Sequence, residues 1–399
     1  MWNRKPLKEV AYTAGRIGWK GLTAKEYVAE GPYFLSVHSL NYGDFVDFRD
    51  AFNITQARYD ESPEIAVEAN DILICKDGAG IGKVGIVKDV EAPTTINSSL
   101  LLIRSLSEIY PKFLYHYLQS PFFQKIVQER IEGATTPHLY QREIKEFPVP
   151  IPELSEQQRI VAILDQAFAD IEKARANAEK NLKNARELFD SYLNAICTKT
   201  SLLPPRRIGD VCSLYQGIAI NKKTKHLLVE RSSLPLLRIK DLKNNSEEQY
   251  VAEEGYPKNS RVYEDDILYT RTGSLGLVFK GRNGVLHNNS FKVEPNELID
   301  KGYLFWWLQH VTFKSMIMQL ALKAAQPDIT HSIFKVQTIE IPSLSYQKDA
   351  VTNIEIYKIK TDELIAKYQR KLLVLDELKK SLLQKAFSGE LTKTEGMVA

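Results

Sequence analysis

The sequence has few cysteines and no long apolar run. Its 399 residues include 3 cysteines, Cys75, Cys197 and Cys212, whose spacing matches neither a zinc site nor a thioredoxin-like motif. A sparse, odd set of this kind indicates a reducing compartment without a disulfide framework. No window reaches the roughly 18 consecutive apolar residues of a membrane-spanning helix, and the first residues lack the apolar core of a signal peptide. We therefore expect a cytoplasmic protein.

An excess of charge of one sign is also missing. The chain has 53 Lys and Arg against 50 Asp and Glu, a formal net charge of +3. This balance excludes a histone-like basic protein but allows a localised basic face. With 44% hydrophobic residues the composition is that of a folded chain, and the length predicts two or three domains.

What the sequence does contain is an internal repeat. Ile151-Pro152 recurs as Ile341-Pro342, and Gln157 recurs as Gln347, each 190 residues later. Asp71-Ile-Leu recurs as Asp266-Ile-Leu at an offset of 195. Small drifts of this kind are what loop insertions produce. A period this long indicates two copies of a domain with a connector rather than a solenoid.

Each copy is predicted to consist of a mixed domain followed by a long helix. We expect mixed domains over residues 1–152 and 201–342, and long helices over residues 153–200 and 343–399. Short β-rich runs begin at Asp71 and Asp266, and amphipathic helices are expected over Tyr110–Val127 and Tyr303–Met318. The predicted fold class is α+β, with two mixed α/β domains separated by a pair of long antiparallel coiled-coil helices in a pseudo-twofold repeat.

The long helices are predicted from heptad spacing. Residues 155–197 contain neither Gly nor Pro, and Ser155 to Gln158 have the form of a capping box. Because the chain carries both helices, we expect them to pair within one molecule, and the alternative is a dimerisation coiled coil between two chains. The residues predicted to pair the helices or to meet a partner are Leu164, Phe168, Ile171, Leu182, Phe189, Ile196, Ile354, Tyr368, Leu372, Leu375 and Leu382.

The motifs that look catalytic are incomplete. Gly80-Ile-Gly82-Lys-Val-Gly85 continues into a β-like run instead of the helix that a dinucleotide site requires. Glu143-Ile-Lys145 has the local form of a nuclease motif, but no Pro-Asp pair precedes it in its half of the chain. We predict glycine turns joining strands, no catalytic residue, no metal ligands, and a binding role rather than an enzyme.

Two segments carry a family resemblance. Residues 150–161, Pro-Ile-Pro-Glu-Leu-Ser-Glu-Gln-Gln-Arg-Ile-Val, resemble the central conserved region of type I restriction–modification DNA specificity subunits, and residues 381–392 resemble the distal conserved end. Asp266 to Gly276 resembles a recurring element of the target recognition domains in that family. In the second copy Leu344-Ser-Tyr-Gln-Lys departs from the family's usual Glu-Gln.

The resemblance implies separate roles for the mixed domains, the long helices and the partner subunits. Each mixed domain would be a target recognition domain that reads one half of an asymmetric, interrupted site in double-stranded DNA, and the helices would fix the spacer. Two methyltransferase subunits would dock on the chain, and two restriction–translocation subunits would join them. S-adenosylmethionine would belong to the methyltransferase, ATP and magnesium to the translocase, and no cofactor to this chain.

DNA bases are read by polar side chains on loops or helices, while other basic groups hold phosphates. The first domain offers as candidates Lys76, Lys83, Thr135, Thr136, His138, Tyr140, Gln141 and Arg142. The second domain offers Lys222, Lys223, Arg271, Thr272, Ser274, Asn289, Gln326, Thr330 and His331.

The charge of the two domains is low for a DNA-binding protein. Residues 1–152 carry 17 basic and 19 acidic groups, and residues 201–342 carry 19 and 15. Since tight DNA binding draws on many phosphate contacts, we expect the methyltransferase partners to supply part of the phosphate contacts. The alternative functions are a coiled-coil interaction scaffold without DNA specificity, or a stand-alone nuclease or methyltransferase.

Overall fold

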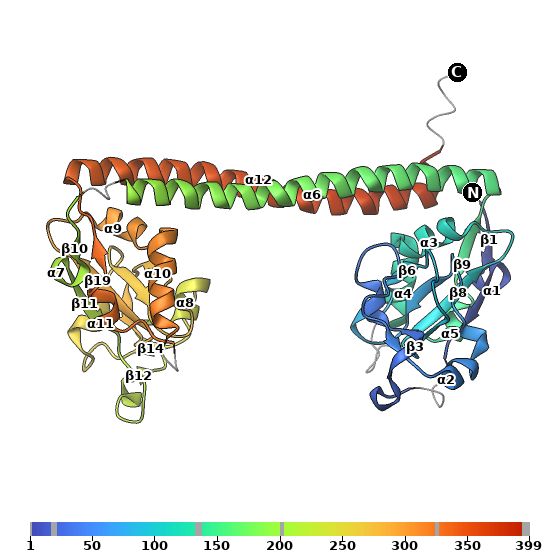
Figure 1. The fold of residues 1–399 in the computed structure, drawn as a ribbon, viewed down its shortest axis with the longest axis horizontal. Coiled ribbons are helices and arrows are strands. Elements are labelled where there is room, and N and C mark those ends of the chain that lie inside the picture. Colours follow the sequence, from blue (N-terminus) through green and yellow to red (C-terminus); the bar gives the residue numbers. More distant parts are fainter. Residues whose placement is uncertain (1, 17–21, 132–137, 200–202, 324–326, 393–399) are drawn as a thin grey trace, which may run out of the picture. The chain divides into compact units, whose positions relative to one another are not determined.

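The chain forms two compact units. The structure, a computed structural model, describes residues 2–16, 22–131, 138–199, 203–323 and 327–392. Unit 1 comprises residues 1–178 and 371–399, and unit 2 comprises residues 179–370. Each unit therefore contains one mixed domain together with parts of both long helices (Figure 1). The sequence predicts four consecutive segments, two mixed domains and two long helices. The two compact units do not follow these segments, because each long helix contributes to both units.

The domain of unit 1 is built on a mostly buried antiparallel sheet with the strand order β2-β8-β5-β6. β5 is an uninterrupted apolar run whose side chains are all buried, as expected for a central strand. Smaller sheets pair β1 with β9 and place β3 between β4 and β7. The strands are β1 (Asn3–Pro6), β2 (Ala11–Ala14), β3 (Val28–Leu35), β4 (Phe52–Asn53), β5 (Ile72–Cys75), β6 (Val84–Ile86), β7 (Thr94–Ile96), β8 (Leu100–Ser105) and β9 (Pro148–Ile151).

Helices cover this sheet on the side of the long helices. α3 contacts β6 and β8, and its Phe113 ring lies 5.2 Å from the ring of Phe387 on the second long helix. Sheet, α3 and long helices thus share one apolar core. The helices of the domain are α1 (Leu7–Val10), α2 (Gln56–Asp60), α3 (Pro111–Gln119), α4 (Pro121–Ile131) and α5 (Gln141–Ile144), with short 3-10 helices at Ala24–Glu26, Val37–Leu40, Pro63–Ile65 and Gly78–Gly80.

The domain of unit 2 repeats this architecture, with a main sheet of order β11-β19-β16-β17 and a β10-β20 pair. Its further small sheets are β13-β18-β15 and β12-β14. The strands are β10 (Arg206–Arg207), β11 (Cys212–Gln216), β12 (Leu228–Val229), β13 (Leu236–Leu237), β14 (Tyr250–Val251), β15 (Arg261–Val262), β16 (Ile267–Thr270), β17 (Val278–Lys280), β18 (Gly284–Leu286), β19 (Ser290–Pro295) and β20 (Thr338–Ile339). The helices are α7 (Ile208–Val211), α8 (Ile239–Asn244), α9 (Lys301–Trp307), α10 (Val311–Ala321) and α11 (His331–Lys335), with 3-10 helices at Lys225–Leu227 and Lys258–Ser260.

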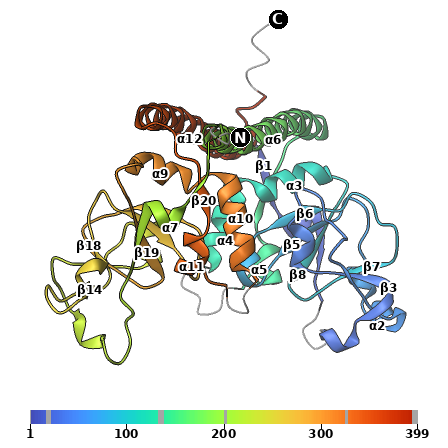
Figure 2. The same ribbon diagram turned by 60° about the vertical axis from the view of Figure 1, so that its left-hand side comes forward.

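The two domains have matching element orders, which confirms the predicted internal repeat and the α+β class. By their order in the main sheets, β2, β5, β6 and β8 correspond to β11, β16, β17 and β19. By their order in the chain, α3, α4 and α5 correspond to α9, α10 and α11, which are labelled in Figure 2. The repeated aspartates have a structural role in this frame. Asp71 accepts from the backbone N–H of Glu68 at 2.7 Å, and Asp266 accepts from that of Tyr263 at 2.9 Å. Each carboxylate closes the turn that leads into a central strand.

Two helix predictions were wrong in their length. The expected helix over Tyr110–Val127 is divided into α3 and α4, because Pro121 lacks an N–H and restricts Ser120, which takes an extended conformation. The expected helix over Tyr303–Met318 is divided into α9 and α10 at His310, whose ring accepts from the N–H of Phe313 at 3.4 Å as an N-cap.

The glycine motifs are turns between strands, as predicted. Gly78 and Gly82 lie between the antiparallel strands β5 and β6 with φ of 74° and 83°, in the left-handed region that glycine adopts without strain. Gly273 and Gly276 connect β16 to β17 in the same way. The three cysteines are free and buried, and burial raises the pKa of Cys197 and Cys212 to about 12. Their thiols are therefore unreactive at neutral pH.

The long helices α6 (Leu154–Thr198) and α12 (Leu344–Ser388) have 45 residues each. α6 begins before Ser155, so the expected capping box is wrong, and Ser155 lies inside the first turn. In unit 1 the carboxylate of Asp376 contacts Arg175, and Lys379 lies 4.8 Å from the ring of Phe168. A higher residue number on α12 thus pairs with a lower residue number on α6, so the two helices run antiparallel within this unit.

The same pairing occurs in unit 2. The ring of Tyr192 on α6 stacks on that of Tyr357 on α12 at 4.2 Å, and the Tyr346 hydroxyl donates to the Ile196 carbonyl at 3.3 Å. Phe189 lies 5.8 Å from the Lys358 ammonium. In the 190-residue repeat, Lys358 is the counterpart of Phe168. The ring lies on α6 and the cation on α12 in both units, so ring and cation have exchanged their positions in the repeat.

Candidate nucleic-acid interface

The candidate DNA-contacting segments lie where the central strands end. Lys76 directly follows β5, and its backbone carbonyl accepts from the N–H of Leu139 at 2.9 Å. Arg271 directly follows β16, and its carbonyl accepts from the N–H of Ile329 at 3.0 Å. One backbone hydrogen bond thus attaches an equivalent loop segment to an equivalent strand end in each domain.

In the first domain this frame brings several predicted residues together. His138 contacts the carboxylate of Asp77, and its ring lies 4.4 Å from that of Tyr140. The guanidinium of Arg142 lies 5.0 Å from the Tyr140 ring. Tyr140 is 49% exposed and Arg142 is exposed. A stacked, exposed aromatic and guanidinium pair can contact either a base edge or a phosphate.

The other described candidates of the first domain are already engaged. Lys83 is exposed and donates to Asn41 at 2.6 Å. Gln141 donates to the backbone carbonyl of Thr13 at 3.0 Å. Lys76 is largely buried, with its ammonium 3.9 Å from the Asp77 carboxylate. Thr135 and Thr136, and Gln326 in the second domain, lie outside the described residues.

In the second domain Arg271 is held from two sides. Its Nε donates to Asp328 Oδ1 at 2.8 Å, its Nη2 contacts the other carboxylate oxygen, and its Nη1 donates to Gln216 at 3.3 Å. Thr272 donates its N–H to the Asn289 carbonyl at 3.4 Å. The Arg271 side chain is thus part of a fixed polar network at the end of β16.

Thr330 and His331 begin α11 beside this network. Thr330 caps the helix by accepting from the N–H of Ile333 at 3.2 Å. The His331 ring lies 4.9 Å from that of Phe291. Burial lowers the pKa of His331, and the positive charges of Arg271 and Lys335 lower it further. His331 is therefore a neutral ring at physiological pH.

Three further candidates lie on neighbouring loops. Ser274 accepts from the ammonium of Lys243 at 2.8 Å, in the turn between β16 and β17. Lys222 and Lys223 are exposed on the loop that follows β11. No hydrogen bond of the described side chains fixes either ammonium, so both lysines can reach a phosphate.

Sequence reasoning missed the acids of this interface. Asp77 and Asp328 were not among the candidates, although each contacts a predicted basic residue. The sequence contained a signal, because Asp77 directly follows Lys76 and Asp328 directly precedes Ile329, and both neighbours belong to the repeated backbone bond. Carboxylates repel phosphate, so neither acid is an obvious candidate for DNA contact. Gln216 was missed because it lies 55 residues before Arg271 in the sequence.

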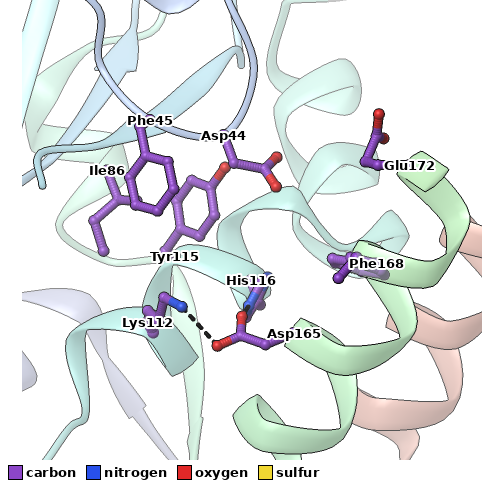
Figure 3. A pocket seen from close by; sticks show the side chains of 10 residues that line it. Asp44, Phe45, Ile86, Lys112, Tyr115, His116, Asp165, Phe168 and Glu172 are labelled. Carbon is purple, nitrogen blue, oxygen red and sulfur yellow. Dashed lines mark hydrogen bonds and ion pairs between the residues drawn. The ribbon is translucent and has the colours of Figure 1, made fainter. Parts of the chain in front are cut away.

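A small cavity lies where the first domain meets α6 (Figure 3). It measures about 260 Å³, and Lys112 and His116 on α3 both contact the Asp165 carboxylate on α6, at 2.6 and 3.2 Å. Burial alone would raise the pKa of Asp165, but the hydrogen bonds from these two partners outweigh it, and the pKa is lowered. The carboxylate therefore stays ionised and ties α3 to α6.

The residues predicted to pair the helices differ in burial. Leu164, Phe168, Ile171, Ile354 and Leu375 are buried. Half-buried are Leu182, Phe189, Ile196, Tyr368, Leu372 and Leu382. Towards the helix ends the fully buried positions move by one residue, to Leu193, Cys197 and Leu383. A straight α-helix drifts about 20° per heptad from a strict seven-residue repeat, so four heptads shift the buried face by nearly one residue.

The opposite face of α12 carries exposed aliphatic side chains. Ile359 in unit 2 and Leu373 in unit 1 are 60% and 63% exposed. The others are Ile356 and Leu364 in unit 2, and Val374 and Leu378 in unit 1. In each unit these exposed apolar side chains are available for contact with a partner.

Neither a metal cluster nor a membrane span was found in the described part of the chain. No group of three His, Cys, Asp or Glu side chains there could hold a metal ion. None of the helices described is long and apolar enough to cross a bilayer.

The comparisons with known proteins agree with one another. A family model described as "Type I restriction modification DNA specificity domain" matches residues 2–180 and again residues 204–374. The chain is 22% identical to the type I restriction enzyme EcoBI specificity subunit of Escherichia coli, over 75% of this chain and 70% of that protein. It is 21% identical to the StySPI specificity subunit of Salmonella potsdam, over 98% and 89%. A chain solved in a study of assembly and conformational transition of the type I R-M system shares the fold, with a TM-score of 0.78, 18% identity and 98% coverage of both chains.

Proposed function

We propose how this chain acts from one premise: it belongs to the family of type I restriction–modification DNA specificity subunits. It is accordingly the DNA-recognition subunit of such a system, it is non-catalytic, and it works in a complex with DNA. The family carries no cofactor of its own. We infer that the domains of residues 1–152 and 201–342 each read one half of an asymmetric bipartite site.

The observation that carries this proposal is a shared frame with different side chains. The bonds from Leu139 to Lys76 and from Ile329 to Arg271 are equivalent, yet the residues after them differ. Tyr140, Gln141 and Arg142 follow in the first domain, and Thr330, His331 and Ser332 in the second. Base edges are distinguished by the side chains presented to them. Two unlike surfaces on one frame support two unlike half-sites.

The exposed candidates then divide by chemistry. Tyr140 and Arg142 are exposed together and are suited to base contact, whereas Lys222 and Lys223 lie on a loop and are suited to phosphate contact. We assign Lys83, Thr272, Ser274 and Asn289 to the same surfaces. Thr135, Thr136 and Gln326 lie outside the described residues, and we keep them in the proposal because of their place in the sequence repeat.

We propose that the long helices set the spacer and bind partners. Residues 153–200 and 343–399 would fix the distance between the half-sites. The buried residues between the two helices would keep them paired. The exposed aliphatic side chains of α12 in each unit would contact methyltransferase subunits. We infer two such subunits, joined by two restriction–translocation subunits, with S-adenosylmethionine in the former and ATP and magnesium in the latter. Because the target is the cell's DNA, we propose a cytoplasmic location.

The test is methylation mapping. The chain is co-expressed with the methyltransferase subunit of its own system, and methylated positions in the host DNA are sequenced with and without the chain. We expect one bipartite motif that disappears when the chain is omitted. Methylation that persists without the chain, or a motif without two separate halves, would contradict the proposal.

A further inference from the structure

Each domain contains one contact between an acidic and a basic side chain that joins a strand end to the loop segment beside it. The first is the hydrogen bond between the Asp77 carboxylate, two residues after β5, and the His138 ring, and this contact is an ion pair only when the ring is protonated. The second is formed by Arg271, directly after β16, and Asp328. Both side-chain pairs are partly exposed, and both lie next to the repeated backbone bond described above.

Acidic and basic side chains have exchanged sides between the two contacts. In the first domain the acid follows the strand and the base lies on the loop, whereas in the second domain the base follows the strand and the acid lies on the loop. His138 and Asp328 occupy the same position of the repeat, one residue before the backbone bond. An attraction across the same gap is thus present in both copies, although its polarity is reversed.

The geometry of the second ion pair also limits what Arg271 can contact. An arginine reads guanine with two parallel N–H donors. Here Nε and Nη2 are directed at Asp328, and Nη1 donates to Gln216. The edge of the guanidinium that would grip a base is therefore occupied. In the first domain His138 is likewise engaged by Asp77.

We propose that the two side-chain pairs, Asp77 with His138 and Arg271 with Asp328, are positioning devices, each of which holds the DNA-contacting segment of its own domain and serves only its own half-site. This inference rests on the proposed function. The groups that contact DNA are then the neighbours of these pairs: the exposed Tyr140 and Arg142 in the first domain, and the half-buried Thr272 and exposed Ser332 in the second.

The test uses the full chain in complex with its methyltransferase and the wild-type methylated motif as reference. Asp328→Asn removes the negative charge while keeping the size of the side chain. We expect the ratio of methylation at matched over mismatched second half-sites to fall about tenfold, comparable to the loss of one base contact. The ratio at the first half-site should stay unchanged. Asp77→Asn should lower the ratio at the first half-site and leave the ratio at the second half-site unchanged.

Rescue separates positioning from general folding. The conservative Asp328→Glu, and the exchange of Arg271→Asp with Asp328→Arg, both restore opposite charges across the gap, and the first domain already uses the reversed polarity. We expect each to recover most of the lost selectivity. Glu248→Gln, which removes an exposed ion pair to Lys240 and Arg238 in the same domain, is the matched control and should change nothing.

The outcomes are distinct. Loss at both half-sites, no loss at either, or failure of both rescue variants would overturn the inference. A variant that does not fold is recognised by loss of the thermal unfolding transition, and the Asp328→Glu and exchange variants then decide the question. If the wild-type complex gives no bipartite motif, the proposed function fails before any variant is measured.

Discussion

Gln157 and Gln347 make the same three hydrogen bonds in the two units. The Gln157 side chain accepts from the N–H of Tyr110 at 2.7 Å and donates to the carbonyls of Glu108 and Pro152 at 3.0 and 2.8 Å. Gln347 accepts from the N–H of Asp300 at 2.7 Å and donates to Leu298 and Pro342 at 3.0 and 2.9 Å. Both side chains are fully buried. One amide thus joins the start of each long helix to its domain.

Replacing either glutamine by alanine should loosen its own unit. The truncation leaves buried backbone groups without partners, which costs about 1–3 kcal/mol for each group left unpaired. We expect Gln157→Ala to lower amide hydrogen-exchange protection in α3 and the first turns of α6, and Gln347→Ala to do so in α9 and α12. The controls are the exposed neighbours Gln158→Ala and Lys348→Ala. Equal loss from control and test variants would contradict the assignment.

Alanine substitutions of two isoleucines on α12 should affect different properties, stability at Ile354 and partner binding at Ile359. Ile354 is fully buried in the core of unit 2, so Ile354→Ala should destabilise that unit by about 2–5 kcal/mol. Ile359 is 60% exposed, so Ile359→Ala should change the free energy of unfolding by no more than about 0.5 kcal/mol. It should instead weaken binding of the methyltransferase, measured by calorimetric titration. Unchanged affinity would remove this face of α12 from the proposed interface.

Unit 2 should lose stability as the pH falls below about 6.5. His310 is buried and its pKa is lowered from 6.5 to about 4 by desolvation. Between these values the unfolded chain takes up a proton that the folded chain does not, so the stability present at neutral pH declines by about 3 kcal/mol towards pH 4. Burial also lowers the pKa of His287 and His331, which adds to the effect.

The contribution of His310 can be isolated by substitution. His310→Asn keeps an N-cap acceptor for α10 without a group that titrates in this range. We expect hydrogen exchange in α10 to depend less steeply on pH in the variant than in the wild type, after correction for the intrinsic exchange rate. A wild-type slope retained in the variant would assign the effect to the other histidines.

Substitution of Arg142 should show whether its guanidinium contacts a base or a phosphate. Arg142→Ala should relax one position of the first half-site by about 1–3 kcal/mol if the guanidinium reads a base. A uniform loss of affinity for all DNA sequences, with a shallower salt dependence, would assign it to phosphate. Binding of the complete complex to a panel of single-base variants of the site measures this. The matched control is Arg130→Ala, since Arg130 is exposed at the end of α4.

Part of the phosphate contact is expected from the partners. The first domain carries more acidic than basic groups, so the isolated chain should bind DNA more weakly than the complex and with a shallower dependence on salt. Titrations of one duplex at several salt concentrations, with and without the methyltransferase, provide the comparison. Equal affinity and equal salt dependence would contradict this expectation.

The repeat could be predicted from the sequence because the residues that recur have the same structural role in both copies. Gln157 joins helix to domain, Asp71 closes a turn, and Ile151-Pro152 ends the last strand before α6. Such residues tolerate little change, so both copies retain them. The break at His310 was not predictable in the same way, because the histidine acts as an N-cap only once the chain has turned there.

The candidate site was only partly predictable for a similar reason. Lys76 and Arg271 were found because they follow recognisable strands. Their acidic neighbours Asp77 and Asp328 become meaningful only when the loop packs against the strand end, which is a contact between residues about 60 positions apart. Charge alone cannot distinguish an arginine that reads DNA from one that is held by an aspartate.

The central claim is that two domains read separate half-sites at a distance set by the helices. Its most direct test removes one heptad from α6 and the facing heptad from α12, and then sequences the methylated motif made by the complex. Two helical turns are about 10 Å, close to three base pairs at 3.4 Å each. We predict a shorter spacer between two unchanged half-sites. Changed half-sites with an unchanged spacer would contradict the account.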